Sequence, residues 1–287
     1  MELIVGKYSG FCKGVSYTYL NALKELKKGK VFCLGEIIHN EHVIKDLENK
    51  GMTTVSSLEE VDDNSKVIFR AHGESEDRYL YAKKHGIDVI DLTCEKVKII
   101  HNKVKEKKND SFIVIIGKKT HPEIIGTVGF AGSNSYVVED ENDFDLLEEK
   151  LIESFYKKIF VISQTTFSST KFDYLVNVLK ERFKEYDITI DKSICNATEL
   201  RQKECEEISK KVNLMVVIGS KNSSNTKELY NISEKNCNKV YFVENREDVD
   251  KINISFDMVV GVVAGASAPK ALIDEIVNYI KEKSNEN

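Results

Sequence analysis

Short apolar runs alternate with longer amphipathic stretches along the whole chain. The runs at 112–117 (FIVIIG) and 258–263 (MVVGVV) are apolar throughout, whereas the stretches that follow them repeat apolar residues every three to four positions. The first pattern predicts strands buried on both faces, and the second predicts amphipathic helices. Strands that alternate with helices in this way favour an α/β fold with parallel sheets.

Three cysteines occupy the same place in this pattern. Cys12, Cys94 and Cys195 each follow an expected strand and open an expected helix, at intervals of 82 and 101 residues. The chain therefore divides into three roughly equal parts, which indicates an internal repeat.

Two further polar turns follow each cysteine at nearly constant offsets. The first turn lies 27, 27 and 28 residues after the cysteine, at His39, His121 and Ser223. The second lies 33, 44 and 44 residues beyond the first, at His72, Thr165 and Ser267. Ligands of parallel sheets bind at the carboxyl ends of the strands, so we expect all nine turns to face a ligand site.

The repeat predicts the domain organisation. We expect three similar α/β modules with mainly parallel sheets, arranged about a pseudo-threefold axis around a central cavity, at 13–95, 96–192 and 193–287. Residues 1–12, with a strand at Leu3–Val5, are expected to complete the third sheet. An eight-stranded α/β barrel is the alternative, but a repeat of about 95 residues fits eight even units poorly.

Composition narrows the classes of function. The chain has 287 residues, 41% of them hydrophobic, and a net charge of −5 with acidic and basic residues interspersed. No basic face stands out, so nucleic acid is not an expected partner. Apolar runs fall short of the about 20 residues that cross a bilayer, and no basic-then-apolar leader follows Met1. We therefore expect no membrane partner and predict a cytoplasmic location.

The cysteines suggest a metal centre. Six cysteines in such a chain are typical of free thiols or metal ligands. If the modules are related by a threefold axis, Cys12, Cys94 and Cys195 converge, each at a helix N-terminus that favours the thiolate. Zinc sites usually use closely spaced C-x₂-C pairs, which this chain lacks. A [4Fe–4S] cluster on three cysteines keeps one open iron, which suits a Lewis acid for a substrate oxygen. The other three lie in a strand, a helix and a loop and are expected to be structural: Cys33, Cys205 and Cys237.

The remaining turns are rich in hydrogen-bond donors. Hydroxyl, amide and imidazole groups at helix N-termini fit a phosphate or diphosphate. Neither a P-loop nor a G-x-G-x-x-G motif occurs, so the expected substrate is a small phosphorylated molecule. The candidate donors are His39, His72, His121, Ser223, Ser224, Asn225 and Ser267.

Glu123 is the one acidic residue in the donor-rich turn THPEIIGT. An acid beside a substrate oxygen can donate protons, with a hydroxyl such as Thr165 relaying them. The alternative is a first-turn glutamate that only stabilises its helix.

Seven motifs carry a resemblance to a known family. GFCKGV, EIIHN, AHG, THPEIIGT, SQTT, GSKNSSNT and AGASAP, in this order and over the whole chain, closely resemble those of the 4-hydroxy-3-methylbut-2-enyl diphosphate reductases. The resemblance implies a [4Fe–4S] enzyme of the last step of the non-mevalonate isoprenoid pathway. Such an enzyme removes the allylic hydroxyl with two electrons and two protons and yields isopentenyl and dimethylallyl diphosphate. Reduced ferredoxin or flavodoxin is the implied electron donor.

The resemblance also implies roles for single residues. It makes the three repeat cysteines the cluster ligands, Glu123 the proton donor and Thr165 the contact of the substrate hydroxyl, and it assigns the seven donors above to the diphosphate. The role of Thr166 stays open. Glu95 stands where the family commonly has proline after the middle cysteine, and its carboxylate is expected to lower the cluster's potential or to favour the helix N-terminus.

A second function from another class is compatible with much of this pattern. A non-catalytic iron–sulfur or zinc redox sensor that binds a phosphorylated ligand would use the same cysteines and donors. Glu123 discriminates the two, because a sensor needs no proton donor beside its ligand.

Overall fold

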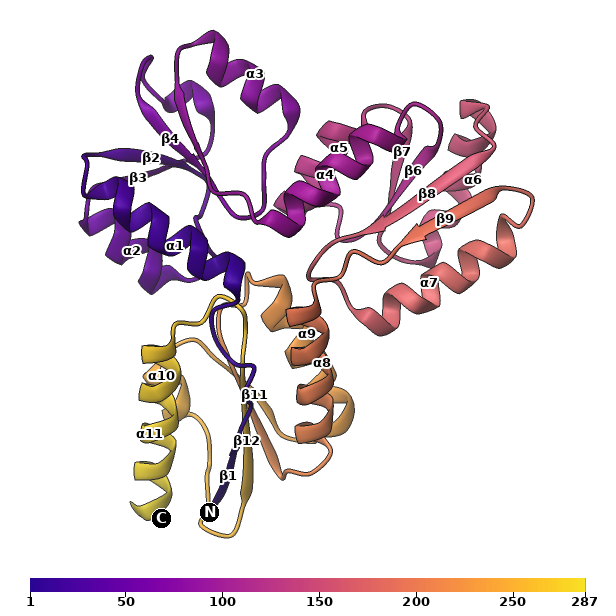
Figure 1. Cartoon of the computed structure of the whole chain (residues 1–287). Coiled ribbons are helices and arrows are strands. Elements are labelled where there is room, and N and C mark those ends of the chain that lie inside the picture. Colours follow the sequence, from indigo (N-terminus) through magenta and orange to yellow (C-terminus); the bar gives the residue numbers. More distant parts are fainter. Residues whose placement is uncertain (287) are drawn as a thin grey trace. The chain divides into compact units, whose positions relative to one another are not determined.

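The structure is a computed structural model that describes residues 1–286. It contains three parallel sheets, whose strands are connected by helices (Figure 1). The first sheet has the order β3–β2–β4–β5, with β2 at Val31–Leu34, β3 at Met52–Val55, β4 at Lys66–Phe69 and β5 at Asp88–Asp91. The second has the order β7–β6–β8–β9, with β6 at Phe112–Ile116, β7 at Ser135–Val138, β8 at Lys158–Ser163 and β9 at Asp187–Asp191. The third has the order β11–β10–β12–β1, with β10 at Leu214–Ile218, β11 at Val240–Val243, β12 at Val259–Ala264 and β1 at Glu2–Val5.

The N-terminal strand belongs to the third sheet. β1 pairs with β12 in parallel, with Leu3 opposite Val260, just as β5 pairs with β4 and β9 pairs with β8. This confirms the prediction that the first strand completes the third sheet. The three sheets thus share one strand order, and three separate sheets exclude the barrel alternative.

Helices connect successive strands, as parallel pairing requires. Those of the first repeat are α1 (Lys13–Leu26), α2 (Glu41–Asn49) and α3 (Glu76–Lys84), with the 3₁₀ turn η1 (Leu58–Glu60). The second repeat has α4 (Glu95–Lys107), α5 (Pro122–Ala131), α6 (Phe144–Ser154) and α7 (Ser169–Arg182), with η2 at Glu141–Asp143. The third has α8 (Asn196–Ser209), α9 (Ser224–Asn236), α10 (Arg246–Asp250) and α11 (Lys270–Glu286). Among the described residues, none of these helices has the length and apolarity of a membrane span.

Each central strand is buried on both faces, which explains the continuous apolar runs. Phe112, Val114 and Ile116 of β6 pack in one cluster with the apolar side chains of α6 and α7. Ile113 and Ile115 pack in a second cluster with residues of α4 and α5. Burying such a side chain contributes about 1.5–3 kcal/mol, so the strand cannot be shifted by one residue without loss.

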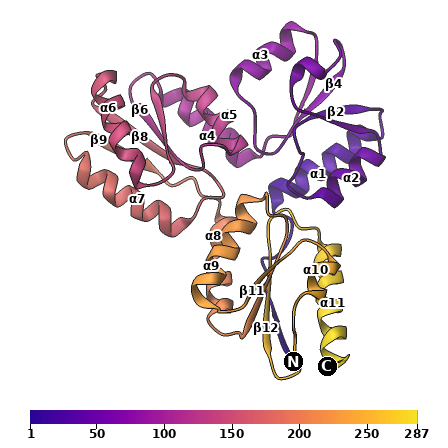
Figure 2. The same ribbon diagram turned by 180° about the vertical axis from the view of Figure 1, so that it is seen from behind.

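The chain forms two compact units. One contains Met1–Ser16, Ile38–Lys45 and the chain from Asn196 onward, and it holds the third sheet. The other contains Tyr17–Ile37 and Asp46–Cys195, and it holds the first two sheets (Figure 2). The module boundaries drawn from the repeat stay predictions.

All nine polar turns follow the carboxyl ends of their strands, as predicted. Cys12, Cys94 and Cys195 come after the edge strands β1, β5 and β9. The other six turns come after the two inner strands of each sheet, β2 and β4, β6 and β8, β10 and β12. The fold therefore presents these residues where a parallel sheet binds ligands.

Candidate active site

The three cysteine turns are built in the same way. In each, the backbone N–H of the cysteine donates to a carbonyl in the turn after the neighbouring inner strand. Cys12 donates to Ala266 at 3.3 Å, Cys94 to Ala71 at 3.0 Å and Cys195 to Thr165 at 2.9 Å. The three cysteine turns, which the spacing predicted to be equivalent, therefore make the same backbone hydrogen bond.

The thiols of these turns differ from the other three. Cys12, Cys94 and Cys195 are partly exposed at or just before a helix start, and the Sγ of Cys12 accepts a hydrogen bond from the N–H of Val15 at 3.4 Å. Donation from a helix N-terminus stabilises a thiolate, the form that ligates metals. The cysteines of the turns thus fit a metal or cluster.

The other thiols are buried and suit packing. Burial raises the pKa of Cys33 to about 12 and that of Cys205 to about 11, so both stay protonated. Cys237 is also buried, beside the end of α9. These positions agree with the structural role expected for all three.

Glu123 and Thr165 contact each other through two hydrogen bonds. Glu123 lies in the first turn of α5, and its Oε1 accepts from the backbone N–H of Thr165 at 2.6 Å. The Thr165 hydroxyl bonds the other oxygen, Oε2, at 2.6 Å. Burial raises the pKa of Glu123 to about 7, although both bonds from Thr165 oppose the shift. This carboxyl group can hold and release a proton near neutral pH.

Two of the predicted histidines lie together in the same unit. His121 caps α5, with its Nδ1 accepting from the N–H of Glu123 at 3.2 Å. An accepting Nδ1 leaves the ring proton on Nε2, from which it can be donated to an anion. The ring of His72 lies edge-on to that of His121, with centroids 5.2 Å apart.

Glycines allow the turn of His72 to approach α5. Gly73 has a φ of +75°, a conformation that other residues rarely adopt. A Cβ on Gly129 of α5 would lie 2.3 Å from the Cβ of Ser75, so only glycine permits this contact. The glycines of THPEIIGTVGF therefore serve to bring two site turns together.

The unit that holds the third sheet contributes donors around α9. Ser223 caps this helix by accepting from the N–H of Thr226 at 3.3 Å, which is the ordinary capping role. Asn225 accepts from the N–H of Ala266 through Oδ1 at 3.1 Å, and this bond fixes its amide beside the turn of Ser267.

Several buried polar atoms in the described part of this unit have no hydrogen-bond partner. Among the described residues, Nδ2 of Asn225 and Oγ of Ser267 are buried and bonded to nothing. A buried unpaired donor costs about 1–3 kcal/mol, so such atoms are candidates for binding a ligand. Two hydrogen-bond donors suit an anion such as phosphate.

The other predicted site residues occupy the same kinds of turn. His39 lies between β2 and α2, and Ser224 is the first residue of α9 and is buried. Thr166 accepts from Nε2 of Gln164 at 2.8 Å, which gives it a role in holding its own turn. Glu95 opens α4 and thus takes the helix-start position considered for it.

The sequence analysis did not identify two residues that hold these turns in place, Gln164 and Arg201. Gln164 is fully buried and accepts from the N–H of Lys118, tying the turns after β6 and β8 together. Arg201, in α8, donates to the carbonyl of Gly10 at 2.6 Å and so braces the turn that holds Cys12. The turn of His72 also packs on His101, which is buried beside Gly73.

The fold and these turns define a class: α/β proteins of three parallel sheets that carry cysteine thiols, anion donors and a protonatable carboxyl group at their strand ends. The chain belongs to the LytB protein family, whose sequence model matches residues 3–281.

Named relatives cover nearly the whole chain. It is 37% identical to a 4-hydroxy-3-methylbut-2-enyl diphosphate reductase of Caldanaerobacter subterraneus subsp. tengcongensis, over 100% of this chain and 99% of that protein. A reductase of the same name from Geobacter sulfurreducens is 36% identical over 99% of each chain. The solved E-1-hydroxy-2-methyl-but-2-enyl-4-diphosphate reductase of Plasmodium falciparum matches with a TM-score of 0.89 at 33% identity, over 96% of this chain and 87% of that one.

Proposed function

We propose that the chain reduces 4-hydroxy-3-methylbut-2-enyl diphosphate to isopentenyl and dimethylallyl diphosphate, the last step of the non-mevalonate isoprenoid pathway. Full-length relatives of this chain carry the name of that reductase. The contact between Glu123 and Thr165 is the observation that carries the proposal, because it provides a buried proton donor beside a hydroxyl group.

The diphosphate is held by the donors of the strand-end turns. Asn225 and Ser267 offer their unpaired atoms, and His121 offers its Nε2 proton. We assign His39, His72, Ser223 and Ser224 to the same group on their positions in equivalent turns. Several hydrogen bonds to charged oxygens, each contributing about 1.5–3 kcal/mol, fix one end of the substrate and orient the other.

A [4Fe–4S] cluster is the cofactor that the thiols fit best. Cys12, Cys94 and Cys195 would hold it, because they are equivalent in backbone geometry and open helices that favour thiolate. The cluster would supply electrons and an open iron for the substrate's hydroxyl oxygen. Three such ligands for four irons would leave that position free for the substrate.

One of the two protons comes from the chain itself. The reaction breaks the allylic C–O bond, consumes two electrons and two protons, and releases the oxygen as water. Protonated Glu123 delivers the proton that the departing oxygen needs, with the Thr165 hydroxyl between them as relay. Burial raises the pKa of this carboxyl group to about 7, so it can carry a proton near neutral pH.

The test is an anaerobic assay on reconstituted protein. With the diphosphate substrate and reduced methyl viologen, we expect both isoprenoid diphosphates to form, with loss of one hydroxyl per two electrons. A protein that binds the substrate with full cluster and forms no product would instead be the redox sensor. We place the reaction in the cytoplasm, with reduced ferredoxin or flavodoxin as the donor.

A further inference from the structure

One exposed face of α1 combines large apolar side chains with lysines. Tyr17, Leu20, Lys24 and Lys27 follow one another at spacings of three and four residues, which places them on one side of the helix and its end. Tyr17 and Leu20 are 52% and 54% exposed. A surface helix normally directs large apolar side chains to the core. This face therefore presents two unburied apolar side chains next to two lysines.

A groove lies along this face. It has a volume of about 540 Å³ and is lined by Leu20, Leu23, Lys24, Leu26, Lys27 and Lys50. We call Tyr17, Leu20, Lys24, Lys27 and Lys50 the α1 face. Apolar groups within a charged rim are the usual anatomy of a transient protein interface.

Fewer lysines of the α1 face than of α4 form an ion pair with a carboxylate. There, Lys98, Lys103 and Lys105 each pair with a carboxylate, those of Asp91, Asp191 and Glu76. On the α1 face Lys50 pairs with Asp46. Lys24 and Lys27 form no ion pair with any residue that the structure describes, and Lys24 bonds only the amide of Asn21. In a chain of net charge −5, this is a local positive surface.

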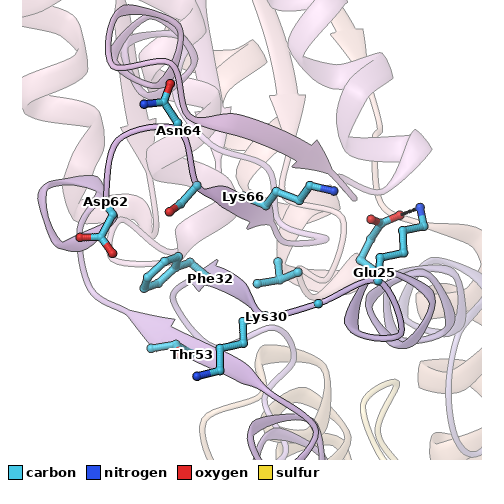
Figure 3. A pocket seen from close by; sticks show the side chains of 11 residues that line it. Glu25, Lys30, Phe32, Thr53, Asp62, Asn64 and Lys66 are labelled. Carbon is cyan, nitrogen blue, oxygen red and sulfur yellow. Dashed lines mark hydrogen bonds and ion pairs between the residues drawn. The ribbon is translucent and has the colours of Figure 1, made fainter.

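Further cationic groups surround a pocket at the C-terminal end of α1 (Figure 3). The pocket has a volume of about 580 Å³, and Lys28, Lys30 and Lys66 contribute to its lining. Lys28 pairs with Glu25 at 2.6 Å, whereas Lys30 and Lys66 extend away in different directions (Figure 3). Glu25 and Asp62 also line this pocket, so its charges are mixed and the unpaired lysines of the groove remain the main positive group of this region.

Most of the α1 face lies on the helix that directly follows Cys12 in the chain. The helix begins at Lys13, directly after Cys12. Leu20 lies seven residues further, about 10 Å along the axis at 1.5 Å per residue. The apolar part of the α1 face is therefore the part nearer to Cys12, and the lysines lie farther along the helix.

We infer that the α1 face is the docking surface for a small acidic electron-carrier protein. The inference rests on the proposed function, because that reaction takes two electrons and the thiols, hydroxyls, imidazoles and carboxyl group of the site supply none. Two molecules of a reduced one-electron carrier are oxidised per substrate. One proton leaves with the hydroxyl oxygen as water, and the second ends on the product carbon.

The charges define how the partner binds. Lysines attract an acidic protein over a Debye length and raise the association rate, while the small apolar centre keeps the complex short-lived. A carrier that must leave after each electron needs such a small interface, below about 1,200 Å². An anionic membrane surface would also attract lysines, but two apolar side chains provide little to insert.

The test compares two reductants on one enzyme. Lys24→Glu/Lys27→Glu is assayed with reduced methyl viologen and with a reduced acidic ferredoxin as donor. With ferredoxin we expect KM for the carrier to rise at least tenfold and its salt dependence to weaken. With methyl viologen the rate should stay within twofold of wild type. Lys180→Glu/Lys184→Glu, a matched pair of exposed lysines at the end of α7, is the control and should change neither rate.

Each outcome has one meaning. An unchanged KM for ferredoxin in Lys24→Glu/Lys27→Glu overturns the docking surface while the proposed function stands. Failure of the wild-type protein with methyl viologen overturns the proposed function instead. Wild-type binding to vesicles of phosphatidylserine and phosphatidylcholine, lost in the double variant with ferredoxin kinetics unchanged, would assign the face to a membrane and end the proposal.

Discussion

Thr165 holds Glu123 by both carboxylate oxygens: its backbone N–H bonds Oε1 and its hydroxyl bonds Oε2, each at 2.6 Å. The two residues are 42 positions apart and come from the turns after β6 and β8. The carbonyl of Thr165 also accepts from the N–H of Cys195. One threonine therefore positions the proposed proton donor and one proposed cluster ligand together.

Glu123→Gln should abolish proton delivery while leaving binding intact. The amide keeps the size and most hydrogen bonds of the carboxyl group but has no acidic proton. Loss of general acid catalysis typically costs 10²–10⁴-fold, so we expect turnover with reduced methyl viologen to fall by about that much. Glu149→Gln, at an exposed position of α6, is the control. Turnover of Glu123→Gln within threefold of wild type would mean that Glu123 only stabilises its helix.

The ionisation of Glu123 should appear in the pH dependence of stability. Its pKa is raised from 4.5 to about 7 by burial, so the folded protein binds more protons than the unfolded chain between these values. The contribution of Glu123 to the free energy of unfolding is therefore largest below about pH 4.5 and decreases as the pH rises to about 7. Denaturant titrations of the ligand-free protein from pH 5 to 8 should show this slope, and Glu123→Gln should show a smaller one. Equal slopes in both proteins would contradict a raised pKa.

The six cysteines should separate into two classes. Replacing Cys12, Cys94 or Cys195 by serine should remove the cluster and the activity, since each opens a helix in an equivalent turn. Replacing Cys33, Cys205 or Cys237 should change iron content little, because these thiols are buried in the core. Iron and sulfide per chain after anaerobic reconstitution measure the difference. A complete cluster in Cys94→Ser would refute its assignment as a ligand.

Ser267→Ala and Asn225→Ala should weaken anion binding. A lost hydrogen bond to a charged oxygen costs about 1.5–3 kcal/mol, which corresponds to roughly tenfold to hundredfold in affinity. Titration calorimetry with pyrophosphate measures this loss, with Asn222→Ala at an exposed position as the control. The ligand-free Ser267→Ala protein should be as stable as wild type or more so, because an unpaired buried hydroxyl is removed. Unaltered pyrophosphate affinity in both variants would contradict the anion site.

The sequence by itself determined the sheets and the places of the site residues. Local patterns are sufficient for this, because a run such as FIVIIG must be buried on both faces and the residue after it must lie at a strand end. The constant offsets between turns then identified Cys12, Cys94 and Cys195 as equivalent, and their backbone bonds confirm that equivalence.

Only the tertiary structure decided which groups meet. That Thr165 bonds both oxygens of Glu123, that Asn225 and Ser267 keep unpaired donors, and that Arg201 braces the turn of Cys12 depends on contacts between distant segments. Net charge also concealed the α1 face, since an average over the chain does not show that Lys24 and Lys27 share one exposed helix side with Tyr17 and Leu20. Burial and exposure are set by what packs against each face, and a linear sequence specifies that only through the fold.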